Sequence, residues 1–309
     1  MRFLFISDTH FTYAPDIENP VWLNRVLINK WDEMRERVVS ELQELKPDAI
    51  IHCGDFTHFG TAEDFAFGKA IMDATGVPWY AVPGNHDTVS GAVRNEMQKE
   101  FSIAAGNSFC YFKVFGRIAI VFLDVCITRV ADKLYSIDDD ALSRFESILT
   151  ANHDKTIFLV CHIPVRYRTA ISDQGKMMFD DRVFSGKIFG RCFESAIGKI
   201  ENVSKIRSII AQNKNVKIVF SGHWHINSLH LSNNVYYKIV PSICEYPCEV
   251  VVADCDDTEI RIHNKAIAGS EFQKDSIISE WNNTWVSGSQ KSRNIMIILN
   301  PTTTLPTRP

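Results

Sequence analysis

Five mostly apolar runs in this 309-residue chain are each followed, within four residues, by side chains that can bind metal ions. The runs cover residues 3–6, 49–51, 79–82, 157–161 and 217–220, and the polar groups after them are Asp8-Thr9-His10, Gly54-Asp55, Gly84-Asn85-His86-Asp87, His162 and Gly222-His223-Trp224-His225. Short apolar runs of this kind are typical of buried strands. In an open α/β sheet, ligands bind at the carboxyl ends of the strands. One sheet edge can therefore gather all these side chains into one site.

The segments between the first runs predict parallel β-α-β units. Apolar residues recur at helical spacing over 22–45, and Thr61 with Asp64 resembles a capping box for a helix that reaches about residue 74. Alternating strands and helices of this kind build a sheet with helices on its faces. The first part of the chain therefore indicates an α/β fold.

The pattern becomes all-β after His225. Short strands are expected over 228–231, 235–240, 249–253, 259–263 and 295–299. Together with the first half, this predicts two stacked sheets with helices outside. We expect one domain over 1–265 and a C-terminal extension over 266–309, packed on the same domain and frayed at its end.

Composition limits the partners of the protein. The formal net charge is −4 and no block rich in Lys or Arg is present, so nucleic acid is not an expected partner. The N-terminus lacks the pattern of a signal peptide, and no apolar run approaches the roughly 20 residues that cross a bilayer. We therefore expect a cytoplasmic protein with no membrane partner. The sequence leaves its oligomeric state open.

The spacing of the carboxylates and imidazoles suits a pair of metal ions. Two divalent cations held about 3.5–4 Å apart need an anionic oxygen between them. Asp55 is the best candidate, because it leaves a strand in the middle of the set with a glycine before it. Asp8 and His10 are two residues apart, so on an extended chain they point the same way and reach one ion. His223 and His225 share this spacing.

Asn85 adds an amide oxygen to this set, and His162 adds another imidazole. A mixture of carboxylate, imidazole and amide ligands suits Mn, Fe or Zn better than Ca or an all-thiolate zinc site. Two divalent metal ions of these kinds are therefore the expected cofactors. Glycines at 54, 84 and 222 are suited to tight turns and close backbone approach.

The motifs D-x-H, G-D, G-N-H-D, H and G-H-x-H occur in this order over residues 8–225. This order resembles the calcineurin-like metallophosphoesterase family. The resemblance implies a four-layer αββα sandwich of two mixed β-sheets flanked by helices. It also implies that one metal is held by Asp8, His10, Asp55 and His225, and the other by Asp55, Asn85, His162 and His223. By the same resemblance, His86 faces the substrate phosphate and protonates or stabilises the leaving oxygen, while Asp87 orients His86.

The resemblance also implies a reaction, in which a hydroxide that bridges the metals attacks phosphorus. The phosphoprotein phosphatase branch carries an Asp-Arg pair shortly after G-D, whereas residues 54–60 here read Gly-Asp-Phe-Thr-His-Phe-Gly. The motifs instead resemble the branch acting on cyclic nucleotides and small phosphodiesters. We therefore expect a phosphodiesterase for a small phosphodiester, with cyclic nucleotides among the candidates.

Two other functions stay open. A DNA nuclease of the same family is disfavoured by the near-neutral charge and the lack of a basic stripe. A catalytically inactive scaffold with this fold is disfavoured because every expected ligand and His86 are present.

Two further residues are candidates for substrate binding. His58 either contacts substrate or the metals, or is a solvated loop histidine. Arg166 belongs to a cation-rich stretch, 163–192, that lies between two ligand motifs. That stretch is either a lid whose cations hold phosphate, or a solvated loop and helix.

Overall fold

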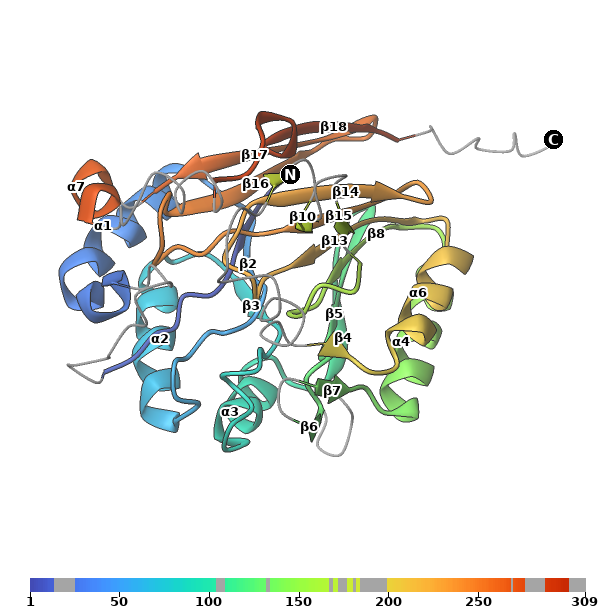
Figure 1. Cartoon of the computed structure of the whole chain (residues 1–309), viewed down its shortest axis with the longest axis horizontal. Helices are drawn as coiled ribbons and strands as arrows, with labels where there is room; N and C mark the ends of the chain where they lie inside the picture. The colour runs from blue at the N-terminus through green and yellow to red at the C-terminus, as the bar shows by residue number, and fades with distance from the viewer. Residues whose placement is uncertain are drawn as a thin grey trace.

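A computed structural model of the chain describes residues 1–13, 26–103, 109–131, 134–166, 199–267, 269–275 and 287–299, with the backbone alone of 169–171, 177–179 and 182–183. The described residues form two six-stranded sheets that are packed together, with helices on both sides (Figure 1). Two three-stranded sheets lie beside them, with the orders β11-β10-β9 and β12-β7-β6.

The first six-stranded sheet has the order β18-β17-β16-β1-β2-β3. Its parallel half consists of β1 (Arg2–Ile6), β2 (Ala49–His52) and β3 (Trp79–Ala81). Its antiparallel half consists of β16 (Glu249–Cys255), β17 (Glu259–Ala266) and β18 (Asn294–Ile298). The first and last parts of the chain therefore share one sheet.

The second six-stranded sheet has the order β14-β15-β13-β8-β5-β4. Its strands are β4 (Cys110–Phe115), β5 (Ile118–Leu123), β8 (Thr156–Val160), β13 (Val216–Ser221), β14 (Ser228–Ser232) and β15 (Val235–Ile239). The inner four strands run parallel, and β4 and β14 pair antiparallel at the edges. The smaller sheets contain β6 (Thr128–Ala131), β7 (Leu134–Ser136), β9 (Thr169–Ile171), β10 (Met177–Phe179), β11 (Arg182–Val183) and β12 (Lys199–Ile200).

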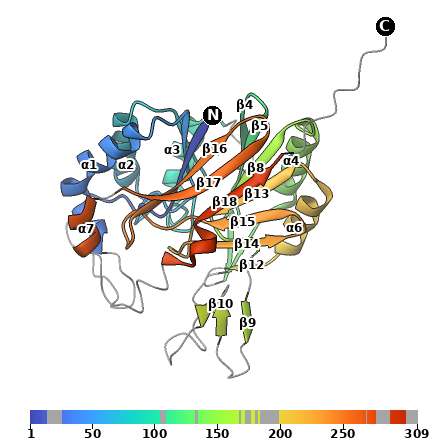
Figure 2. The ribbon, with the colours of Figure 1, turned by 90° about the horizontal axis from the view of Figure 1, so that it is seen from above.

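Helices cover the outer faces of the two sheets (Figure 2). On the side of the first sheet lie α1 (Trp31–Glu44), α2 (Ala62–Ala74) and α3 (Ala92–Glu100), with the 3₁₀ turn η1 (Val26–Lys30) and α7 (Gly269–Asp275) next to α1. On the side of the second sheet lie α4 (Asp139–Ala151) and α6 (Val203–Gln212). A second 3₁₀ turn, η2 (Gln290–Ser292), precedes β18.

Strand alternation divides the apolar side chains between two cores. In β8, Phe158 and Val160 face the core between the sheets, whereas Ile157 and Leu159 face the core under α4 and α6. Successive side chains of a strand point to opposite faces, so a continuous apolar run is what a strand covered on both sides requires. The sheets meet through stacked aromatic rings, such as Phe5 and Phe220 with centroids 3.6 Å apart.

These layers confirm the predicted four-layer αββα sandwich of two mixed sheets. The capping prediction at Thr61 is half right. The Thr61 hydroxyl accepts a hydrogen bond from the Asp64 N–H, but the Asp64 carboxylate accepts from the backbone of Tyr13 and Phe59 rather than from Thr61. The predicted strands after His225 divide between the sheets, since β14 and β15 join the second and β16–β18 the first. The boundary at 265/266 stays a prediction.

Within the ranges given above, no helix combines the length and the apolar character that a membrane-spanning helix needs.

Candidate metal centre

Loops at the carboxyl ends of five strands carry the candidate ligands. They are Asp8 and His10 after β1, Asp55 after β2, Asn85 after β3, His162 after β8, and His223 and His225 after β13. The loops from the two sheets are joined directly, because the Asp8 N–H donates to the Gly54 carbonyl at 3.0 Å and the His223 N–H donates to the Asp8 carboxylate at 3.0 Å. The structure thus brings the predicted ligands of both sheets to one end of the sandwich.

The first ligand group, here called the Asp8 group, consists of Asp8, His10, Asp55 and His225, all of which are buried. Each offers one ligand atom, and these atoms lie within 4.8 Å of one another. His225 Nε2 is 3.3 Å from Asp8 Oδ1 and 3.2 Å from His10 Nε2. His10 Nε2 is in turn 3.8 Å from Asp55 Oδ2.

The second ligand group, here called the His162 group, consists of Asp55, Asn85, His162 and His223. His162 Nε2 lies 3.2 Å from Asp55 Oδ2, 3.1 Å from Asn85 Oδ1 and 3.2 Å from His223 Nδ1. The same oxygen, Asp55 Oδ2, therefore faces both groups. This is the placement that a carboxylate between two cations requires.

The distances within both groups fit metal coordination. Metal–nitrogen and metal–oxygen bonds of about 2.1 Å separate neighbouring ligand atoms by about 3.0–3.4 Å in octahedral and tetrahedral sites. The separations of 3.1–3.3 Å around His162 Nε2 and His225 Nε2 lie in this range. Nitrogen and oxygen ligands without thiolate match the Mn, Fe or Zn chemistry expected from the sequence.

The electrostatics keep both carboxylates ionised. Burial works against the charge of Asp55, but attraction to the imidazoles of His162 and His86 holds its pKa well below the usual range. At Asp8, burial again opposes the charge, and attraction to His225 lowers the pKa overall. Ionised carboxylates are the form that binds a cation.

The pKa values of the two histidines in the His162 group shift in opposite directions. Burial disfavours a protonated His162, yet the attraction of Asp55 raises its pKa to about 9. Burial, reinforced by repulsion from His162, lowers the pKa of His223 to about 3. A cation bound in this group would therefore displace a proton from His162, whereas His223 is neutral without a cation.

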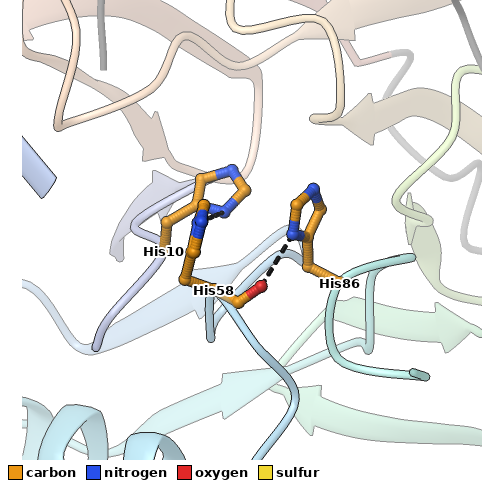
Figure 3. A group of neighbouring side chains, drawn as sticks. All are labelled: His10, His58 and His86. Atoms are coloured by element: carbon orange, nitrogen blue, oxygen red, sulfur yellow. Dashed lines mark hydrogen bonds between the residues drawn. The ribbon is translucent and has the colours of Figure 1, made fainter. Parts of the chain in front are cut away.

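Three imidazoles lie together at the rim of the centre, His10, His58 and His86 (Figure 3). His86 Nδ1 is 2.8 Å from the carbonyl oxygen of His58. A carbonyl only accepts, so Nδ1 carries a hydrogen and Nε2 is the atom at which His86 gains or loses a proton. His58 Nδ1 is 3.3 Å from His10 Nδ1, so one of these two nitrogens donates to the other. His58 and His86 are both partly exposed, unlike His10.

A family model described as calcineurin-like phosphoesterase matches residues 1–227, which include every ligand of both groups. The chain belongs to the calcineurin-like phosphoesterases. The resemblance predicted from the five motifs is therefore confirmed.

Two curated relatives of this phosphoesterase carry phosphodiesterase names. This chain is 26% identical over 169 residues to a probable glycerophosphodiester phosphodiesterase, GpdQ, of Arcobacter nitrofigilis, and the match covers 52% of this chain and 55% of that protein. It is 24% identical over 200 residues to a probable cyclic nucleotide phosphodiesterase of Fibrobacter succinogenes, covering 63% of this chain and 64% of that protein. The chain thus spans less than two thirds of the length of either relative.

Solved structures share the fold of this phosphoesterase. A dimetal phosphatase of Danio rerio superposes with a TM-score of 0.60 at 13% identity, covering 86% of this chain and 96% of that one. A purple acid phosphatase of yellow lupin gives a TM-score of 0.59 at 13% identity, covering 96% of this chain and 53% of that one. At such identities the likeness concerns the fold alone.

The backbone of the phosphoesterase at the ligands corrects one part of the sequence argument. Asp8 and His10 were expected to point the same way from an extended chain, but both have left-handed backbones, with φ of 51° and 45°. Asp55, His223 and His225 also have positive φ, from 51° to 71°. Such conformations are disfavoured for residues with a Cβ and cluster at functional sites. Turns, rather than strand alternation, aim these side chains at one another.

Asp87 contacts the backbone of neighbouring loops, and its predicted role in orienting His86 stays a prediction. Its carboxylate accepts hydrogen bonds from the N–H groups of Phe56, Thr57 and Gly84 at 2.7–3.0 Å, and from the Thr57 hydroxyl at 2.7 Å. The bond at His86 Nδ1 goes to a backbone carbonyl. Burial, with repulsion from Asp55, raises the pKa of Asp87 to about 6. Asp87 therefore fastens the loops after β2 and β3 to each other.

One buried carboxylate at the centre is missed by the motif analysis. Glu245 Oε1 lies 2.5 Å from His225 Nδ1, and the residue is 2% exposed. The sequence does contain a signal for this residue, because Glu245 is the one charged residue in a stretch of mostly apolar or small residues, 239–248. A buried charge without a partner is costly, so such a residue points to a polar site nearby.

The contacts of Arg166 are with residues that are not candidate ligands. Its guanidinium donates to the Ser232 hydroxyl at 3.2 Å and lies 5.9 Å from the ring centre of Tyr237. Ser232 belongs to the edge strand β14 of the second sheet, and Tyr237 belongs to the adjacent strand β15. Its predicted contact with substrate stays a prediction, and the side chains of the proposed lid beyond Arg166, over 167–192, lie outside the described residues.

Gly84 provides a test of how closely the ligand loops approach. A Cβ on Gly84 would collide with the backbone nitrogen and the Oδ1 of Asp55. We expect Gly84→Ala to displace Asp55, to lower the melting temperature by about 4 °C or more, and to abolish metal binding, as measured by calorimetric melting and metal analysis. Gly76→Ala is the control, because its Cβ would enter open space and only its left-handed φ is strained. Metal content equal to wild type in Gly84→Ala would contradict this close approach.

Proposed function

We propose that this phosphoesterase hydrolyses small phosphodiesters with two divalent cations, one in the Asp8 group and one in the His162 group. The observation that carries the proposal is the position of Asp55 Oδ2, which faces His10 of one group and His162 of the other. When bound, such a pair of cations supplies an acidified water and positive charge for the phosphoryl oxygens. Every other step falls to the side chains of the chain itself.

His86 donates a proton to the leaving group in this proposal. Its Nδ1 is held by the His58 carbonyl, and its ring lies 4.6 Å from that of His10. This fixes the direction of Nε2, where a proton can be held for the departing oxygen. A cationic imidazole at this point also stabilises charge that develops in the transition state.

The substrate approaches from the partly exposed side of the centre. Asn85, His86, His223 and His58 are partly exposed, whereas the ligands at the back, such as Asp8 and His162, are fully buried. A phosphodiester placed on this side meets both ligand groups and His86 together. The names of the two curated relatives support a small diester, either a glycerophosphodiester or a cyclic nucleotide.

A substrate panel tests the proposed activity. The metal-free protein is loaded with Mn, Fe(II) or Zn and assayed with bis(p-nitrophenyl) phosphate, cyclic nucleotides, glycerophosphodiesters, phosphomonoesters and DNA. We expect small diesters to have the highest kcat/KM, and chelation to remove the activity. Faster turnover of DNA would favour the nuclease, and no turnover of any ester by metal-loaded protein would favour a binding scaffold.

His58 is proposed to bind the substrate through its ring. We expect His58→Ala to raise KM for a diester by about tenfold, the value of one lost hydrogen bond to a charged group. The contact that holds His86 is made by the His58 backbone, which the substitution retains. Steady-state kinetics at saturating metal measure the change, and His153→Ala, which removes an exposed histidine outside the ligand groups, is the control. An unaltered KM would exclude this role.

A further inference from the structure

The ring of His225 has different partners on its two nitrogens. Nε2 faces Asp8 and His10 within the Asp8 group, at 3.3 and 3.2 Å. Nδ1 faces Glu245 Oε1 at 2.5 Å. A cation in the Asp8 group needs the lone pair of Nε2, so the ring hydrogen must then lie on Nδ1 and be donated to Glu245.

The segment that carries Glu245 contacts two residues of the Asp8 group. The Ser242 hydroxyl and the Cys244 thiol both donate to the carbonyl oxygen of Asp8, at 2.8 and 3.1 Å. Glu245 itself reaches His225 and is 2% exposed. Residues 242–245 therefore support two ligands of the same group from behind.

The His162 group is supported in a different way. His162 Nδ1 lies 2.9 Å from the carbonyl oxygen of Cys53, so a neutral backbone group fixes its ring. His225 instead has a carboxylate. A carboxylate both selects the Nδ1–H form and makes the opposite nitrogen a stronger donor to a cation. The difference between the two histidines identifies Glu245 as specific to the Asp8 group.

We propose that Glu245 is a positioning residue that holds His225 in the Nδ1–H form and strengthens cation binding in the Asp8 group. The inference rests on the two-metal function proposed above. Glu245 contacts the ring of His225 and would act on a cation through that ring. Partners of this kind typically change metal affinity by about 10- to 100-fold.

The test compares two buried glutamates by substitution with the isosteric amide. Glu245→Gln keeps the volume of the side chain and removes its charge. Glu249→Gln is the control, because Glu249 is similarly buried, at 4%, but contacts Asn264 and Arg293 rather than a ligand. Chelator competition with Mn measures the affinity of each binding step, and thermal melting of the metal-free proteins measures stability.

We expect Glu245→Gln to weaken one of the two Mn binding steps by about tenfold or more, with the other unchanged. Activity should return to near the wild-type value at saturating Mn, and Glu249→Gln should bind Mn like wild type. Equal affinities in all three proteins, equal losses in both variants, or a loss of kcat that saturating Mn does not restore would each overturn the inference. Wild-type protein that binds no metal would instead refute the proposed function.

A second measurement tests the inference even if Glu245→Gln does not fold. In wild-type protein loaded with diamagnetic Zn, ¹⁵N-histidine spectra should show a hydrogen on His225 Nδ1 that exchanges slowly with solvent. The signal of His225 is assigned because it is missing from the spectrum of the His225→Asn variant. A Zn-loaded spectrum with no hydrogen on His225 Nδ1 would overturn the inference even if Glu245→Gln cannot be purified.

Discussion

Replacing Asp55 with asparagine is expected to remove both metal ions from the phosphoesterase and to lower kcat/KM on the order of 10³-fold or more. The reason is that Asp55 Oδ2 faces both ligand groups, so one substitution removes an anionic ligand from each. Asparagine has almost the same volume, so the change isolates the charge. Metal analysis and kinetics on bis(p-nitrophenyl) phosphate, with Mn in excess, measure the two effects.

Asp124→Asn is the matched control for that substitution. Asp124 is also fully buried, but its carboxylate pairs with Arg94 at 2.8 Å and belongs to neither ligand group. We expect this variant to melt at a lower temperature and still to bind two metals. If Asp55→Asn retained both metals, or lost no more of them than Asp124→Asn, the shared position of Asp55 would have no functional meaning.

The second large effect is expected at His86. His86→Ala should lower kcat by about 10²-fold or more while metal content stays that of wild type, because we propose that the ring carries a proton rather than binding a metal. His86 belongs to neither the Asp8 group nor the His162 group, and its Nδ1 is already used by the His58 carbonyl. Turnover is measured at saturating metal, with metal content determined on the same samples.

The choice of leaving group sharpens that test. A p-nitrophenolate departs with little need of a proton, whereas an alkoxide requires one, so the loss in His86→Ala should be much larger for an alkyl diester. His153→Ala is expected to leave both reactions unchanged. An equal loss with both leaving groups would show that His86 does not act as a general acid, and a loss of metal would assign it to the ligands instead.

Much of the centre could be predicted from the sequence because its ligands follow buried strands. The parallel strands β1, β2 and β3, and likewise β8 and β13, end at the same edge of their sheets, so residues far apart in sequence meet there. The apolar runs before His162 and His223 are continuous because each strand is covered on both faces. The position of β2 between β1 and β3 therefore brings the loop of Asp55 close to the loops that carry Asp8 and Asn85.

The remaining features depend on backbone geometry and on contacts that no local pattern contains. Left-handed turns at Asp8 and His10 replace the extended chain that spacing suggested. Three of the four hydrogen bonds of Asp87 join two loops that are about 30 residues apart in sequence, and the support of His225 by Glu245 spans 20 residues. The division of the C-terminal strands between two sheets likewise depends on tertiary packing.

The most direct test of the two-metal centre is a crystal structure of the Mn-loaded protein with anomalous scattering data collected at the Mn edge. Two anomalous peaks about 3.5–4 Å apart are predicted, one within the Asp8 group and one within the His162 group, with Asp55 between them. A single peak, or Mn bound only outside these residues, would contradict the proposal that this protein is a dinuclear phosphodiesterase.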